Sequence, residues 1–288
     1  MGFKIDLHVH TQSFGRTFMT PTSVRAAVRA RGLDGIAVVN FFNISHALWL
    51  KQQLPDVVIL VGQEIWSRDG HIIGLGLSRK IMDFRSAEET VADIHAQGGI
   101  AVAAHPYLHL GVKGKILSVP FDAVEVYNAA VAHAFFYNAL AARRAKRAGL
   151  PGVAASDTTD PRFIGQSYVE VLADRREDII KSIARGDVHL TRRALPLPLG
   201  FIMRNFLQHR DVEPCPLHAA PCFLCGKSMI VRLWASRFIC HDCGKEEFAR
   251  VGCCNGHYFC LPCLAKRVHA RDDQAVGDRD FYAKEIGP

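Results

Sequence analysis

Short apolar runs alternate with amphipathic stretches through the first 190 residues of the chain. The apolar runs are continuous and rich in valine and isoleucine, a pattern that is typical of strands covered on both faces. The predicted strands are residues 3–11, 35–41, 57–65, 71–77, 99–107, 123–128, 152–157 and 167–173.

Helical patterns lie between several of these strands, at residues 21–32, 86–99, 132–149 and 174–186. The last three end in glycine, which is a common helix stop, and the first begins with Pro-Thr-Ser, which suits a helix start. Repeated strand–helix units of this kind predict a parallel α/β barrel.

Chemistry-bearing side chains fall near the ends of the predicted strands. His8 and His10, in "IDLHVHT", are one residue apart and therefore project to the same side of the first strand. Four further residues lie at or near other strand ends: Glu64, His71, His105 and Asp157. Active sites of parallel barrels form at the carboxyl ends of the strands, and imidazole with carboxylate suits Zn, Mn and Fe. The pattern predicts a metal site.

The cysteines divide the chain. All nine lie at or after Cys215. The run "PLPL" within residues 191–214 favours an extended connector. We therefore predict a barrel over residues 1–190, a linker over 191–214, a cysteine-rich module over 215–270 and a charged tail over 271–288.

The cysteine-rich module has the spacing of a zinc-binding segment. We expect no signal peptide, so zinc is favoured over disulfides, and eight ligands predict two closed structural sites. The predicted ligands are Cys222, Cys225, Cys240, Cys243, Cys254, His257, Cys260 and Cys263. An interleaved arrangement would join the first pair to Cys254/His257 and the second to Cys260/Cys263, and a sequential arrangement is the alternative. Cys253 is an alternative to Cys254.

The net charge is +7, a mild basic excess that is compatible with a phosphorylated small molecule or with nucleic acid as partner. No apolar stretch is long enough to span a bilayer, so we expect a cytoplasmic protein without membrane contact. The zinc module suggests either a protein or a nucleic-acid partner.

Several motifs, in order along the chain, resemble those of the PHP (polymerase and histidinol phosphatase) family. They are "DLHVHT", "GLDGIAVVN", "GQEIW" with "GHIIGLGL", "GGIAVAAHP", "DAVEVYN" and "ASDTTD", and they cover roughly residues 3–190. The resemblance implies a distorted seven-stranded β/α barrel that holds a cluster of metals and hydrolyses phosphate esters. It also implies that His8, His10, Glu64 and Asp157 hold one metal and that Glu64, His71 and His105 hold a second, with Glu64 bridging.

The chain departs from the family pattern at a third metal position. There the resemblance aligns Arg16, Phe41 and Thr159 with histidine ligands, and none of these is a good ligand. We therefore predict two divalent ions in the barrel (Mn, Fe or Zn), with His46 as an alternative third ligand that we do not favour. Arg16, as a bidentate clamp, and His109 are predicted to bind the substrate phosphate.

The resulting hypothesis is a binuclear phosphoesterase that hydrolyses a phosphate mono- or diester through a hydroxide bridging the two metals, with Glu64 and Arg16 as catalytic residues. Glu125 and Asn128 are expected either to orient the ligands or to make ordinary loop hydrogen bonds. Two alternatives are a zinc protein that binds nucleic acid or protein and carries a weakened barrel, and a hydrolase acting on a bond other than a phosphate ester.

Overall fold

A computed structural model describes residues 2–13, 17–108, 110–132, 135–194, 229–253, 255–260 and 263. The chain divides into two compact units, one made of residues 1–12 and 17–195 and the other of 13–16 and 196–288. The predicted linker lies almost entirely outside the described residues, as does the charged tail. Its boundaries therefore stay predictions.

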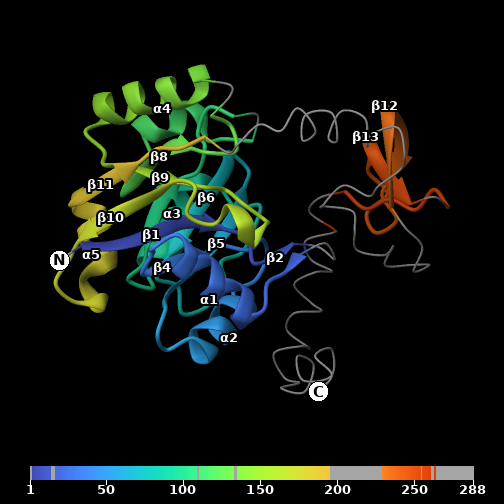
Figure 1. Ribbon diagram of the computed structural model, residues 1–288. Helices are drawn as coiled ribbons and strands as arrows, with labels where there is room; N and C mark the ends of the chain where they lie inside the picture. The colour runs from blue at the N-terminus through green and yellow to red at the C-terminus, as the bar shows by residue number, and fades with distance from the viewer. Residues whose placement is uncertain are drawn as a thin grey trace. The chain divides into compact units, whose positions relative to one another are not determined.

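Unit 1 is an α/β structure built on a nine-stranded sheet (Figure 1). The strands, in spatial order, are β11 (Val188–Thr191), β10 (Tyr168–Leu172), β1 (Gly2–Val9), β4 (Gly35–Val38), β5 (Val58–Ser67), β6 (Gly70–Leu75), β7 (Ile100–Ala103), β8 (Ala123–Asn128) and β9 (Gly152–Ala155). A bridge between Val9 and Thr158 brings the end of β9 beside β1. The seven strands β1 and β4–β9 thus form a nearly closed barrel, as expected, and β10 and β11 extend it.

The barrel is mixed, so the expectation of an all-parallel barrel is wrong for one strand. β6 pairs antiparallel with both β5 and β7, whereas the other neighbours within the ring are parallel. Only Arg68 and Asp69 separate β5 from β6, and a connection this short permits only an antiparallel hairpin. The start of β6, with His71, therefore lies at the same barrel end as the carboxyl ends of β5 and β7.

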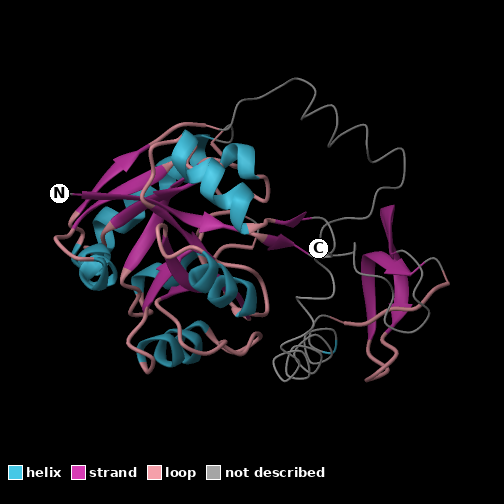
Figure 2. Ribbon diagram, turned by 60° about the horizontal axis from the view of Figure 1, so that its bottom comes forward, coloured by secondary structure: helices cyan, strands magenta, loops and turns pink. Residues whose placement is uncertain are grey.

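Helices cover the barrel (Figure 2). They are α1 (Pro21–Ala30), α2 (Ser45–Gln53), α3 (Ala87–His95), α4 (Phe135–Ala148) and α5 (Ile179–Arg185). The helix α1 begins at Pro21, as predicted, and is capped by Thr20, whereas α3 begins with a Ser86–Glu89 capping box. The short helix α2 was not predicted, because its sequence has no clear apolar periodicity. Other short elements are β2 (Gln12–Ser13), β3 (Thr17–Phe18), η1 (Lys113–Leu117), η2 (Pro161–Phe163) and η3 (Arg176–Asp178).

Two apolar clusters hold unit 1 together. One joins strand residues to Val24 and Val28 of α1, Leu50 of α2 and Ile94 of α3. The other joins strand residues to α5. Burial at about 25 cal/mol per Å² of apolar surface makes these contacts the main stabilising contribution of the unit. Among the described residues, no helix combines the length and apolarity needed to cross a membrane.

Unit 2 contains an antiparallel hairpin of β12 (Met229–Ile239) and β13 (Glu246–Cys253). The turn between the two strands carries Cys240 and Cys243. Tyr258 packs against Cys240, Cys260 and Cys263, which are buried. This small cluster is the only apolar cluster found among the described residues of the unit.

Candidate metal centre

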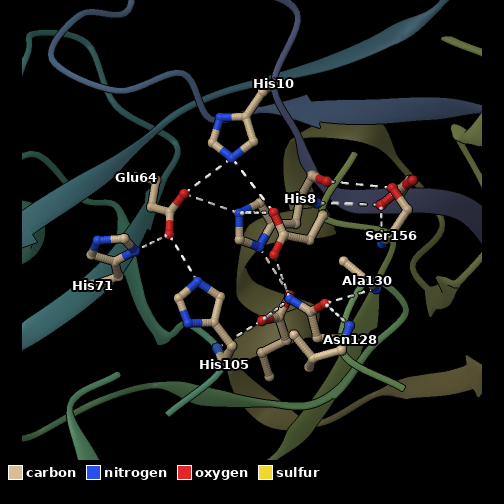
Figure 3. A network of polar contacts seen from close by, with 12 residues as sticks. His8, His10, Glu64, His71, His105, Asn128, Ala130 and Ser156 are labelled. Atoms are coloured by element: carbon tan, nitrogen blue, oxygen red, sulfur yellow. Dashed lines mark hydrogen bonds and ion pairs between the residues drawn. The ribbon is translucent and has the colours of Figure 1, made fainter. Parts of the chain in front are cut away.

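The structure brings all six predicted barrel ligands together at one end of the barrel, and Figure 3 labels all of them but Asp157. His8 lies in β1 and His10 just after it, Glu64 lies in β5, and His71 begins β6. His105 and Asp157 follow β7 and β9. Residues up to 149 positions apart in sequence thus meet because each lies at or beside a strand end. All but Asp157 are buried, and the side chain of Asp157 is 20 % exposed.

Glu64 lies at the centre of the cluster. Its Oε2 atom is 3.2 Å from His8 Nε2 and 3.1 Å from His10 Nε2. Its Oε1 atom is 2.7 Å from His71 Nδ1 and 3.0 Å from His105 Nε2. Each carboxylate oxygen therefore faces its own pair of imidazoles, which is the arrangement expected of a carboxylate shared between two ion positions.

Asp157 completes the half of the site near β1. Its Oδ1 atom lies 3.3 Å from His8 Nε2 and 3.7 Å from His10 Nε2. Ligand atoms that lie within 4.8 Å of one another form two groups, one of His8, His10 and Asp157 and one of His8, Glu64 and His105. His71 joins the cluster through its contact with Glu64.

Glu125 and Asn128 orient the ligands. His8 Nδ1 lies 3.0 Å from Glu125 Oε1, a contact that directs the other ring nitrogen, Nε2, toward Glu64 and Asp157. Glu125 Oε2 accepts hydrogen bonds from the backbone N–H of His105 and from the Asn128 side chain. The same Asn128 amide lies 2.8 Å from Asp157 Oδ2. The structure therefore favours the expectation that Glu125 and Asn128 orient the ligands over the expectation of ordinary loop hydrogen bonds.

Asp6 of β1 links this strand to the segment that follows β9 through hydrogen bonds. Its buried carboxylate accepts hydrogen bonds from the backbone N–H groups of His8, Ser156 and Gly165. Burial raises the pKa of Asp6 to about 6, against the lowering effect of these hydrogen bonds. Asp6 therefore fixes the backbone at His8 and at Ser156, the residue before Asp157, and does not contribute a ligand.

The backbone itself is unusual at two of the ligands. His105 has φ 25° and Asp157 has φ 52°, values that non-glycine residues seldom adopt and that cost roughly 1–3 kcal/mol each. Gly111 packs against the first of these loops, and a Cβ there would lie 2.4 Å from backbone atoms of Pro106. Strain of this kind persists where the surrounding structure fixes side chains for a task.

The electrostatics of the cluster are those of crowded imidazoles and carboxylates. Burial disfavours ionisation of Glu64, but His71 and His8 outweigh it and hold its pKa well below the usual range. Burial lowers the pKa of His8, yet Asp157, Glu125 and Glu64 raise it well above normal. The pKa of His105 is raised to about 8, because Glu64 outweighs burial. The carboxylates are therefore anionic at neutral pH, as ligands must be.

The donor set fits divalent metal ions. Both ring nitrogens of His71 are buried and make no hydrogen bond within the described part of the chain. His71 Nδ1 is close to Glu64 without hydrogen-bond geometry, so the two groups converge on one volume rather than binding each other. Four imidazoles and two carboxylates form a nitrogen–oxygen set suited to Mn, Fe or Zn.

Aromatic rings line the side where a third ion would need ligands. Phe41 stacks on His10, with ring centroids 4.7 Å apart, and lies edge-on to His71. Trp66 stacks on His71 at 5.2 Å. Nothing in the sequence patterns indicated these ring contacts.

Two other residues considered for a third ion, Thr159 and His46, do not join the cluster. Thr159 is exposed. His46 lies in α2, where its Nδ1 is 2.8 Å from the Thr11 hydroxyl, and burial lowers its pKa to about 4. Arg16 and His109 lie outside the described residues, so their predicted roles stay predictions.

Unit 2 has a separate group of metal-binding side chains. The sulfur atoms of Cys240, Cys243, Cys260 and Cys263 lie within 4.8 Å of one another, and Cys243 Sγ is 3.6 Å from Cys260 Sγ. All four are free thiols. Sulfurs around tetrahedral zinc, with Zn–S near 2.3 Å, are about 3.8 Å apart. This grouping corresponds to the interleaved arrangement. Cys222, Cys225 and Cys254 lie outside the described residues, whereas His257 is described.

A mixed barrel with imidazoles and carboxylates at one end defines a class of metal-binding α/β barrels, and comparisons place the chain within it. Residues 136–188 match the family model described as PHP-associated. The chain is also 31 % identical over 140 residues to the uncharacterized protein MJ1587 of Methanocaldococcus jannaschii, a match that covers 44 % of this chain and 82 % of that protein. The chain belongs to the PHP family.

Solved structures share the fold. A two-domain protein from Bacteroides vulgatus, described as containing a predicted PHP-like metal-dependent phosphoesterase, has a TM-score of 0.55 at 16 % identity and covers 89 % of this chain and 88 % of its own. PsfC from Pseudomonas syringae also has a TM-score of 0.55, at 19 % identity, with 73 % and 98 % covered. At these identities the likeness is one of fold.

Proposed function

We propose that the barrel is a binuclear metal-dependent phosphoesterase that hydrolyses a phosphate mono- or diester. The observation that carries the proposal is the position of Glu64, whose two oxygens each face a separate pair of imidazoles. Family membership supports it, as does the description of the Bacteroides vulgatus protein as a PHP-like metal-dependent phosphoesterase.

In this proposal His8, His10, Glu64 and Asp157 hold one ion, and Glu64, His71 and His105 hold the other. Two divalent ions held there would supply Lewis-acid chemistry: they would lower the pKa of a bound water and offset charge on the phosphoryl oxygens. Glu64 and Asp157 offset only two of the four positive charges, so the site keeps an attraction for phosphate.

The chain's own residues then set the geometry. Glu125 holds the imidazole of His8 with Nε2 toward the site, and Asn128 holds the carboxylate of Asp157. Phe41 and Trp66 pack against His10 and His71 and exclude water from that side. We assign Arg16 as the phosphate clamp and His109 as a second phosphate contact on sequence grounds. Because Glu125 and Asn128 fix the orientation of His8 and Asp157 before a substrate binds, these ligands are preorganised, as electrostatic catalysis requires.

For unit 2 we propose two structural zinc ions. Cys240, Cys243, Cys260 and Cys263 would hold one, and Cys222, Cys225, Cys254 and His257 the other. The close sulfur contacts support the first assignment. The unit has a small apolar cluster, so zinc would contribute much of its folding free energy.

A second candidate function is a zinc protein that binds nucleic acid or protein and carries a barrel with little turnover. The observation that favours it is the aromatic ring of Phe41 at the third-ion position. Measured hydrolysis of a phosphate ester distinguishes the two candidate functions.

The test is hydrolysis of an aryl phosphate monoester and of a bis-aryl diester by the full chain, with and without added Mn²⁺. We expect metal-dependent release of the aryl alcohol from at least one ester and loss of that release in Glu64→Gln. A metal-loaded protein that hydrolyses neither ester would overturn the proposal and favour the binding function.

A further inference from the structure

Helix α4 presents an exposed stripe that begins with an aromatic ring and continues with cations. Phe136, Ala139, Arg143, Lys146 and Arg147 are exposed, whereas Ala141 and Ala145 of the opposite face are buried. Exposed positions three or four residues apart lie above one another on a helix, so they form one stripe. From Phe136 to Arg147 the stripe is about 16 Å long, at 1.5 Å per residue.

The charge of this region is entirely positive. Between Glu125 and Asp157 the sequence contains no aspartate or glutamate, and α4 carries Arg143, Arg144, Lys146 and Arg147. The helix packs against β8 and η1. The acidic residue of β8, Glu125, is buried against His8 and Asn128. The charged residues of η1 are both lysines. No ion pair within the described part of the chain neutralises the cations of α4.

The first turn of α4 is hydrogen-bonded to Asn128, which contacts a predicted metal ligand. The Asn138 side chain accepts from the backbone N–H of Asn128 and donates to its carbonyl, at 3.2 and 3.1 Å. Asn128 in turn contacts Asp157, a predicted ligand. Phe136 is 53 % exposed and packs on Tyr137, with ring centroids 4.0 Å apart. These contacts place the first turn of α4 on the metal-site side of the barrel, and the helix runs along the outside of unit 1 (Figure 1).

We infer that the α4 stripe binds single-stranded nucleic acid, with a base stacked near Phe136 and the phosphate backbone running along Arg143, Lys146 and Arg147. A stacking ring followed by regularly spaced cations is the combination that recognises single strands without sequence preference. The stripe delivers a phosphodiester toward the metal centre. In this respect the inference rests on the proposed function and narrows its substrate to a polynucleotide.

The experiment measures the affinity of a labelled oligothymidine for the full chain by fluorescence anisotropy over a range of salt concentrations. The Glu64→Gln background keeps the strand from being consumed. Combined Arg143→Gln, Lys146→Gln and Arg147→Gln should raise Kd at least tenfold and reduce the slope of log K against log salt by about 2, since each phosphate contact on a single strand contributes about 0.7. A matched control removes three exposed cations from other helices and turns: Arg31→Gln, Lys51→Gln and Lys181→Gln.

Phe136→Ala tests the stacking half of the inference. It should raise Kd for oligothymidine roughly fivefold or more while leaving the affinity for inorganic polyphosphate, which has no bases, unchanged. Since the ring is largely exposed, this variant should fold like the parent.

Equal losses in the α4 triple variant and in the control triple would overturn the inference, because they would indicate long-range attraction alone. Unchanged affinity in Phe136→Ala would also overturn it. Failure of the proposed function is distinguishable: strand binding that depends on α4, in a wild-type protein that hydrolyses no ester, would retain the inference and reject the hydrolase.

Discussion

The two candidate metal sites are built in opposite ways. The barrel ligands come from strand ends between His8 and Asp157 and lie above two large apolar clusters. The cysteine ligands come from one hairpin and the segment after it, where Tyr258 packs against three of the cysteines in a small cluster of described residues. In the barrel the fold positions the donors. In unit 2 the donors would depend on the metal to stay together, because four thiols without a metal contribute little to folding.

Zinc removal should give the largest effect and separate the two sites. Structural zinc contributes an apparent free energy of about 10–16 kcal/mol, far more than a small unit retains without it. A strong chelator should therefore abolish amide-exchange protection in β12 and β13 of the full chain while the barrel strands stay protected.

Cys260→Ser provides the same test without a chelator and leaves the barrel ions in place. If protection in unit 2 survives both treatments, the hairpin folds on its own and the contrast between the two sites fails.

Glu64→Gln should be the most damaging change in the barrel. The amide keeps the shape but loses the charge that serves both ion positions. We expect kcat/KM to fall by roughly a thousandfold, against about a hundredfold for His71→Ala, which affects one position. Steady-state kinetics on the aryl ester, with exposed Glu177→Gln as control, measures the difference. Equal losses in the two barrel variants would place the bridge elsewhere.

Arg16→Ala tests the phosphate clamp. It should retain both barrel ions but lower kcat/KM by about 10- to 100-fold, or about 1.4–2.8 kcal/mol. Arg16→Lys should restore little, because a point charge lacks the planar fork of a guanidinium. Metal content and kinetics measured on the same preparations check both statements. An Arg16→Ala enzyme as active as the parent would show that Arg16 is not the phosphate clamp.

Gly111→Ala tests how firmly the barrel holds a ligand loop. The new Cβ would overlap the backbone at His105 and Pro106, so the free energy of unfolding should fall by about 1–3 kcal/mol. Gly114→Ala, where a Cβ meets nothing within 4 Å, is the matched control. Denaturant unfolding of both variants gives the comparison, and equal stability would mean that the loop yields easily.

Much of the barrel was accessible from the sequence, because continuous apolar strands with metal-ligating side chains at their ends are typical of an α/β barrel with a metal site at one end. The direction of β6 was not, since periodicity does not encode strand direction, although the two-residue connection after Ser67 signals a hairpin. The roles of Glu125 and Asn128 depend on long-range contacts and were left open. The packing of Phe41 on His10 had no local signal.

In the cysteine segment the sequence identified the ligands but not how they are paired. Its spacing indicated ligands at once, yet pairing was open until Cys240 and Cys243 were found beside Cys260 and Cys263. Local spacing identifies a donor, whereas the partner of that donor is a property of the fold.

His46 should give the smallest effect, through pH. Its pKa is lowered by burial to about 4, so the unfolded chain binds its proton more readily. The resulting stability is fully present above pH 6.5 and is lost as the pH falls from 6.5 toward 4. Between pH 7 and pH 5.5 the loss should be about 1 kcal/mol. The difference in unfolding free energy between the parent and His46→Gln, measured over this pH range, isolates the contribution of His46. A difference that does not change with pH would contradict the prediction.

The central claim is that Glu64 is shared between two metal ions. Anomalous diffraction from crystals of the metal-loaded protein, recorded at the absorption edges of Mn, Fe and Zn, tests it most directly. The account predicts two peaks in the barrel, one near Oε1 with His71 and His105 and one near Oε2 with His8, His10 and Asp157. A single barrel peak, or two peaks that do not share the Glu64 carboxylate, would contradict it.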